Sequence, residues 1–462
     1  MNQTAAATAG ASDHALSRSL RPRHMTMISI GGIIGAGLFV GSSAAISAVG
    51  PAIVLSYAIT GALVLLVMRM LGEMAVAMPE VRSFTEFARV GLGNWAGFAS
   101  GWLYWYFWII VVPVEAIAGA NILHDWFSAI PTWVIGIGLM AVMTGVNLMS
   151  ARSYGEFEFW FASIKVAAII VFIAVAAAFV LGLAGPGHIG LSNLTAHDGF
   201  MPRGPKSVLA AVTTVFFALT GAEIVTVAAA ESVEPSKAVA RMTSTIVWRV
   251  LMFYVGSIFL IVCVVPWDTI VSGKSPFVAA LKTMRIEYAD LMMSAIILTA
   301  VLSCLNSAFY VASRVLFVLA EHGDAPRWLV KTNARHVPAR SVLLGGVAGL
   351  AGILAREAAP NAVFTFLVNA SGAVMVFVYG ATCVAQVRLR RAREARGAPA
   401  PALTMWFFPW ASYLAIAAMV AVLIAMAMSP EHRDELQATV LSVAAALIAY
   451  VLLRRGRSAP PA

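Results

Sequence analysis

Long apolar stretches recur from one end of the chain to the other, with short polar segments between them. A helix needs about 20 mostly apolar residues to cross a bilayer, and most of the stretches have roughly that length. The pattern therefore predicts an all-α membrane protein with about twelve transmembrane helices. The expected helices lie at 26–47, 51–76, 95–121, 131–149, 157–183, 207–229, 243–265, 288–313, 341–356, 361–386, 404–428 and 437–453.

The composition supports a chain that lies in lipid. Hydrophobic residues make up 60% of the 462 residues and charged residues only 11%, whereas a soluble domain usually carries about 25% charged residues. The three cysteines, Cys263, Cys304 and Cys383, lie far apart inside apolar stretches, as expected of small packing residues. The sequence contains no CxxC pair and no His/Cys cluster at metal-ligand spacing, so we expect no metal and no other cofactor.

The charged residues also indicate on which side of the membrane each end lies. The formal net charge is +9, and most Lys and Arg residues fall in the N-terminal tail, in every second loop and near the C-terminus. Because cytoplasmic loops carry an excess of Lys and Arg, this distribution predicts that both termini are cytoplasmic. Basic residues spread over the loops of a membrane protein do not point to nucleic acid as a partner. The first 24 residues are polar and Ala-rich, which predicts a tail rather than a cleavable signal peptide.

The first expected helix contains four glycines within seven residues: Gly31, Gly32, Gly35 and Gly37. Each glycine in a helix interior costs about 1 kcal/mol relative to alanine. Close helix packing could explain Gly31 and Gly35, which are four residues apart, but Gly32 and Gly37 lie on other faces. The pattern therefore favours an unwound segment, which occurs at membrane depth only where it lines an enclosed or wet cavity. Free N–H groups at the start of the following half-helix would favour a carboxylate.

A second interruption lies five helices later, where Thr220, Gly221 and Glu223 break an apolar run. Interruptions in corresponding helices of two halves point to the binding site of a transporter. Helices 1–5 and 6–10 would then form two repeats, and because five is an odd number the second repeat would be inverted. N–H groups of the first break and carbonyls of the second would suit a ligand with a carboxylate and an amine, which describes an amino acid.

Several segments carry the residues of a known family. They include 32–41, Met68–Ala75, Gly101–Trp105, Pro113–Ala116, Tyr154–Trp160, Gly221–Thr226, Ala230–Ser232, Ser303–Ser307 and Gly323–Pro326. Here, and over about Ser17 to Arg455 as a whole, the chain resembles amino acid permeases of the amino acid–polyamine–organocation superfamily, in particular the GABA (gamma-aminobutyrate) permeases. The resemblance implies a five-plus-five inverted repeat with two extra helices. It also implies proton-driven uptake across the bacterial inner membrane by alternating access.

These expectations divide the chain into a membrane core and its flanking segments. The expected parts are a cytoplasmic tail (1–24), a transport core (25–386) with repeats at about 25–185 and 205–386, a basic cytoplasmic loop (387–403), helices 11 and 12 (404–454) and a second tail (455–462).

The expected substrate site combines the two breaks with one acidic residue of helix 3. Its residues are Ile33, Ile34, Gly35, Ala36, Gly37, Glu115, Phe217, Ala218, Thr220 and Gly221. The resemblance implies that Phe217 covers the substrate as an aromatic lid, although packing alone would also explain it. Glu115 could bind a cationic group of the substrate or pair with a neighbouring residue.

Two ionisable residues inside the expected helices are candidates for coupling transport to protons. Lys165 lies in helix 5, where a charge costs about 2.5–3.5 kcal/mol by insertion scales. Its side chain could extend to the cytoplasmic interface, but the resemblance implies a proton carrier beside the first break. Glu223 could cap freed backbone N–H groups or take part directly in coupling.

Together, these features predict import of an amino acid by proton symport, with GABA or a related amino acid as the substrate. The chain departs from the GABA permeases at Gly37 and Ala218–Thr220, so proline, aromatic or basic amino acids are alternatives, as is amino acid exchange. A membrane enzyme would need a catalytic set, and all eight histidines fall in loops, tails or helix ends. A channel would more often repeat one pore motif by symmetry. The expected partners are the amino acid, protons and the lipid bilayer.

Overall fold

The computed structural model describes residues 23–24, 27, 34–81, 83–149, 151–183, 190–224, 250–428 and 433–457. Throughout these ranges the regular structure is helical, without a strand. Most of the expected tail 1–24 lies outside the described residues.

The helices follow one another in a simple order, with short 3-10 or π-helical segments labelled η. They are η1 (Gly37–Gly41), α3 (Ser42–Val49), α4 (Ile53–Ala77), α5 (Phe84–Leu92), α6 (Asn94–Trp126), α7 (Thr132–Asn147), α8 (Ala151–Val180), η2 (Ser192–Leu194), α9 (Gly204–Ala210), α10 (Val212–Leu219), η4 (Val250–Gly256), α13 (Ser257–Val264), η5 (Trp267–Thr269), α14 (Pro276–Thr283), α15 (Ala289–Glu321), η6 (Arg327–Val330), α16 (Ala339–Ala358), α17 (Pro360–Ala395), α18 (Trp410–Met428) and α19 (Arg433–Arg457).

Eight helices within the described ranges are long and apolar enough to cross a membrane, so the chain is a multi-pass membrane protein. Four shorter apolar helices, at 37–49, 132–147, 204–219 and 252–264, lie within or near the other four expected stretches. Both α6 and α15 have 33 residues, which makes each about 50 Å long. This exceeds the roughly 30 Å hydrocarbon core. Both helices also continue past the ends that the sequence pattern predicts, residues 121 and 313.

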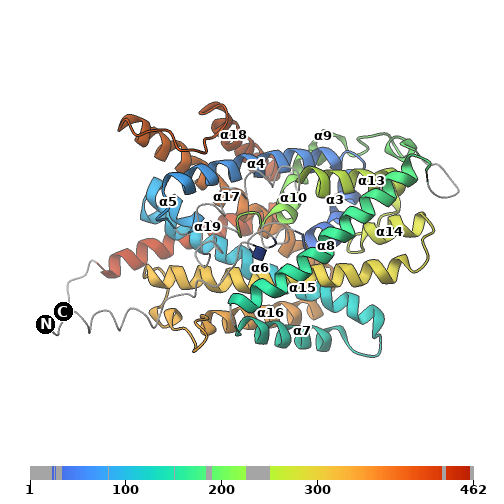
Figure 1. Cartoon of the computed structure of the whole chain (residues 1–462), viewed down its shortest axis with the longest axis horizontal. Helices are drawn as coiled ribbons and strands as arrows, with labels where there is room; N and C mark the ends of the chain where they lie inside the picture. Colours follow the sequence, from blue (N-terminus) through green and yellow to red (C-terminus); the bar gives the residue numbers. More distant parts are fainter. Residues whose placement is uncertain are drawn as a thin grey trace.

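The interior of the molecule is formed by α6, α15 and α17. In the most apolar part of both α6 and α15, 72% of the residues are buried, whereas in α19 only 11% are. The long helices α4, α6 and α15 run roughly in one direction in Figure 1, and α8 crosses them at an angle. α8 packs against α15 and α13, while the short α10 packs against η1, α4 and α17. The two expected breaks therefore lie inside the bundle rather than at its surface.

α17 is longer than expected, because it continues to Ala395 through part of the segment 387–403 that was expected to be a loop. Two contacts stabilise its basic end. Arg390 donates to Glu394 one helical turn further along, and Arg393 donates to the carbonyl of Ala77 at the end of α4. The buried Glu73 of α4 also accepts hydrogen bonds from Gln386 at 3.1 Å and from Arg390 at 3.4 Å. These contacts hold the end of α17 against α4.

Candidate functional site

Two helix ends meet in the middle of the bundle, as the two sequence interruptions suggest. Ile34 and Gly35 are not helical, and η1 begins at Gly37. On the other side, α10 ends at Leu219 and Thr220 has an extended backbone. Gly221 follows with a φ of +125°, a conformation that glycine adopts without a steric penalty. η1 and α10 pack against each other, so the first break faces the second.

Two glycines of the first break allow this close approach. A Cβ on Gly37 would lie 2.8 Å from the Ala218 Cα. A Cβ on Gly35 would lie 2.7 Å from the Cys304 Sγ and 2.8 Å from a Glu115 carboxylate oxygen. Since such distances are too short for a carbon atom, both positions require the absence of a side chain.

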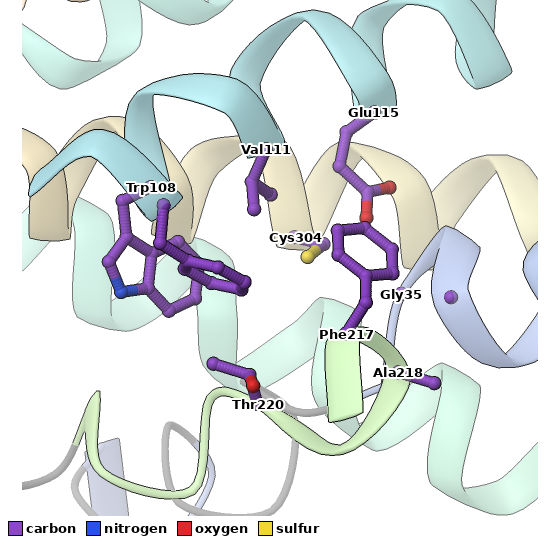
Figure 2. A pocket seen from close by; sticks show the side chains of 10 residues that line it. Gly35, Trp108, Val111, Glu115, Phe217, Ala218, Thr220 and Cys304 are labelled. Carbon is purple, nitrogen blue, oxygen red and sulfur yellow. The ribbon is translucent and has the colours of Figure 1, made fainter. Parts of the chain in front are cut away.

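A small pocket lies between the breaks, α6 and α15, and Figure 2 shows the side chains that enter it. Its lining residues are Gly35, Gly37, Phe107, Trp108, Val111, Glu115, Phe217, Ala218, Thr220 and Cys304. The space open to the centre of a water molecule is about 10 Å³, which is on the order of one water. An amino acid can enter only if the walls move.

Phe217 lines this space from the end of α10. It is 6% exposed and its ring centroid lies 6.2 Å from that of Phe107 on α6. In Figure 2 its ring points from the end of α10 toward Glu115 and Cys304. Its role as a lid stays a prediction; at this position, movement of the ring would enlarge the pocket.

Glu115 comes from α6 and is 1% exposed. The backbone N–H of Ala36 donates to its two carboxylate oxygens at 3.1 and 3.2 Å. The Ala36 N–H belongs to the break whose free N–H groups were expected to bind a carboxylate of the ligand. It donates to the Glu115 carboxylate instead. Two roles were considered for Glu115: binding a cationic group of the substrate, or pairing with a neighbouring residue. The structure shows a contact of the second kind, with the backbone of the first break.

Lys165 on α8 is fully buried and reaches the other side of the same break. Its Nζ donates to the Ile34 carbonyl and to the Ser303 hydroxyl, both at 2.8 Å. Its ammonium group therefore does not extend to the membrane surface. A charge at this position acts directly on the backbone of the first break.

Glu223 lies directly after the second break and is also fully buried. It accepts the Gly221 N–H at 3.1 Å, which is the capping contact considered for it. The hydroxyls of Tyr379 on α17 and Tyr104 on α6 donate to its carboxylate at 2.7 and 3.1 Å. Glu223 thus ties the broken end of α10 to two long helices.

The structure brings most of the expected site residues together. Six line the pocket: Gly35, Gly37, Glu115, Phe217, Ala218 and Thr220. Ile34, Ala36 and Gly221 shape the breaks next to the pocket without lining it, and Ile33 lies outside the described residues, as do Gly31 and Gly32. No group of three His, Cys, Asp or Glu residues in the described part of the chain could hold a metal ion.

Sequence reasoning missed several residues around the site. Trp108 and Val111 line the pocket together with Glu115, and their spacing of three and four residues places all three on one face of α6. That spacing could have identified them. Cys304 was assigned to packing. Glu158 lies in the family segment Tyr154–Trp160 but was given no role, and the structure shows that it is buried and pairs with Lys165 at 3.7 Å.

Membrane-crossing helices around a small pocket between two helix ends are typical of a membrane carrier. The chain belongs to the amino acid permease family, whose model matches residues 24–454. It is therefore a transport protein and not an enzyme.

The similarity to individual relatives extends over nearly the whole chain. It is 49% identical to a probable GABA permease of Pseudomonas aeruginosa, covering 92% of this chain and 90% of the relative. It is 44% identical to the gamma-aminobutyric acid permease of Bacillus subtilis, covering 96% of this chain and 95% of the relative. Identity to the aromatic amino acid transport protein AroP of Corynebacterium glutamicum is 39%, with 90% and 92% covered.

Proposed function

We propose that this permease imports an amino acid across the bacterial inner membrane by proton symport, through alternating access. The observation that carries the proposal is the buried Lys165, whose Nζ donates to the Ile34 carbonyl in the first break. An ionisable group in contact with the broken helix can link the protonation state of the carrier to the shape of its binding site.

We further infer that twelve helices cross the membrane as a five-plus-five inverted repeat with two extra helices, with both termini in the cytoplasm. The eight long apolar helices and the four shorter ones support this count. Two of the shorter helices, 37–49 and 204–219, begin or end at a break. This is what we expect of two discontinuous helices when the described residues cover one half of each.

The proposed substrate is GABA or a related amino acid. Support for GABA comes from the relatives, since those with 49% and 44% identity are described as GABA permeases. The pocket supports a zwitterion more generally: Glu115 offers a negative partner for an ammonium group, and the Ala36 N–H, which Glu115 now accepts, would offer a partner for a carboxylate once Glu115 turns to the substrate. The aromatic wall formed by Phe107, Trp108 and Phe217 favours an aromatic amino acid as the second candidate.

Alternating access then requires movement at the breaks. The pocket has room for about one water, so binding must displace Phe217 or separate α10 from α6. In the proposed cycle, Lys165 carries the proton. Protonated, it bonds the Ile34 carbonyl with a full positive charge, and proton loss weakens that charge-assisted bond. The first break could then move relative to α8.

Uptake by purified protein in lipid vesicles tests this function. Labelled GABA, proline, phenylalanine, lysine and alanine would be offered with and without an inward proton gradient. We expect saturable uptake of at least one of them that the gradient drives above equilibrium. Uptake that ignores the gradient, with full exchange activity, would identify an exchanger instead.

Lys165→Met is the matching test of the coupling residue. We expect it to abolish accumulation against a gradient, because methionine keeps the length of the side chain and carries no proton. Lys282→Met, at a lysine whose side chain is 61% exposed, is the control and should accumulate substrate normally. Full proton-driven uptake by the Lys165 variant would rule out this role.

A further inference from the structure

A second ionisable residue lies two turns from Lys165 on the same face of α8. Glu158 is fully buried, and the proposed function does not yet give its carboxylate a role. Its Oε2 accepts hydrogen bonds from the hydroxyls of Ser303 at 2.7 Å and Ser307 at 3.3 Å, both on α15. Its Oε1 lies 3.7 Å from the Lys165 Nζ and has no hydrogen-bond partner among the described residues.

The Ser303 hydroxyl stands directly between the two charged groups. It accepts a hydrogen bond from the Lys165 Nζ at 2.8 Å and donates one to Glu158 Oε2 at 2.7 Å. A hydroxyl can accept and donate at the same time. The three groups therefore form a continuous hydrogen-bonded path from an ammonium to a carboxylate.

Stability alone gives a weak reason for this arrangement. A buried ion pair is often no more stabilising than well-packed apolar residues of similar volume. Here one carboxylate oxygen lacks a hydrogen bond, so the carboxylate is incompletely satisfied. A buried carboxylate next to an ammonium, whose Oε2 already accepts the bridging hydroxyl, is suited to accept a proton.

We propose that Glu158 is the proton acceptor of Lys165, with Ser303 as the bridge. The inference rests on the proposed function, because it presumes that Lys165 carries the transported proton. In the transfer, the Lys165 Nζ–H bond breaks and a new O–H bond forms at Ser303 Oγ. At the same time the original Ser303 proton passes to Glu158 Oε2. Lys165 and Glu158 both end neutral, and Ser303 is unchanged.

The path continues beyond Glu158 toward the start of α8. Ser307, which donates to Glu158, lies 3.1 Å from the Tyr154 hydroxyl. The Tyr154 ring stacks on Tyr310 with centroids 3.9 Å apart. The other titratable groups near Glu158 are Lys165 and Tyr154 on α8 and Cys304 on α15. In the proposed orientation this end of α8 faces the cytoplasm, so the path runs toward the inner side of the membrane.

Separate assays of accumulation and exchange test the relay, with the amino acid that the wild type accumulates best among GABA, proline, phenylalanine, lysine and alanine. Glu158→Gln keeps the side-chain shape but cannot take up the proton. We expect gradient-driven uptake to fall by about 100-fold, at the low end of what a positioned proton-transfer group contributes. Exchange of internal for external substrate should stay within about twofold, because it needs no net proton release.

Ser303→Ala separates the relay from a structural role of the ion pair. It leaves both charged groups in place and removes only the bridge, so it should slow gradient-driven uptake and preserve exchange. Glu158→Asp should restore part of the uptake lost in Glu158→Gln. Glu357→Gln, at an exposed carboxylate, is the matched control and should behave like the wild type.

Each outcome decides between the hypotheses. Folded Glu158→Gln or Ser303→Ala protein that accumulates substrate as well as the wild type overturns the relay while the proposed function stands. Equal loss of exchange and accumulation in folded Ser303→Ala would also overturn it, because that points to a structural role. If Glu158→Gln does not fold, Ser303→Ala decides. Wild-type protein that shows no proton-driven accumulation of any of the five amino acids overturns the proposed function itself.

Discussion

At Gly37 the site depends on the absence of a side chain. The Ala218 Cα lies only 2.8 Å from the place where a Cβ would be, so the two breaks are in backbone contact. The break itself was predicted from the cost of glycine in a helix. The structure shows why glycine is needed here: a side chain would clash with the second break. The sequence could not reveal the partner, because Ala218 approaches from a segment about 180 residues away.

Substitution of Gly37 by alanine tests this contact. We expect Gly37→Ala to force the first break away from α10, at a cost of about 1–3 kcal/mol typical of an overpacked core. Transport should fall strongly while the protein still folds. Gly41→Ala is the control on the same segment, because its Cβ would lie 3.6 Å from the nearest atom, the Ala36 carbonyl oxygen. Uptake rates and melting temperatures of both variants check the prediction, and equal uptake by the two would contradict it.

Among the helices, α10 depends most on its neighbours. It has only eight residues, which is too short to be stable by itself, and it is held between η1, α4 and α17. On α17, a Cβ at Gly372 would lie 2.2 Å from the Thr213 carbonyl oxygen of α10. The apolar run predicted a helix here and Gly221 predicted its interruption. Neither pattern predicted that α17 would support the short half.

We expect Gly372→Ala to separate α17 from α10 and to disturb the second break. Because the clash is with backbone, no side-chain rotation can relieve it, and we expect a loss of stability of about 1–3 kcal/mol together with loss of uptake. Gly380→Ala lies on the same helix and places its Cβ 3.9 Å from the nearest atom, the Met419 sulfur, so it should be tolerated. A thermal unfolding assay on the two purified variants provides the comparison, and a Gly372 variant as stable as the Gly380 variant would argue against this support.

For the whole molecule, the apolar stretches were sufficient to predict an all-α membrane fold. This worked because a bilayer leaves no water to bond the backbone, so a spanning segment must satisfy its own N–H and C=O groups. The expected stretch 51–76 is close to α4, which runs from Ile53 to Ala77. Exact ends were less predictable: α17 continues to Ala395 because contacts with α4 and its own Arg390–Glu394 pair extend it past the apolar run. Contacts between helices, such as Glu158 with Ser303, leave no mark in a single sequence.

The orientation in the membrane can be tested with introduced cysteines. The native cysteines at 263, 304 and 383 are all buried, so they should react poorly with a membrane-impermeant maleimide. Thr195 is exposed, and the proposed orientation places it outside, so we expect Thr195→Cys to be labelled in cells with a permeabilised outer membrane and an intact inner membrane. Ala398→Cys, exposed between α17 and α18, should be labelled only after the inner membrane is opened. The reverse pattern would invert the proposed topology.

The small volume between the two breaks has a consequence for selectivity. With room for about one water, the resting protein offers no ready-made space, and every substrate must supply the free energy for moving Phe217 and its neighbours. A substrate that is too large demands more displacement than its contacts can offset. One that is too small opens the same walls and leaves a partly empty interior with fewer contacts. We therefore expect the pocket to discriminate against small substrates as well as large ones.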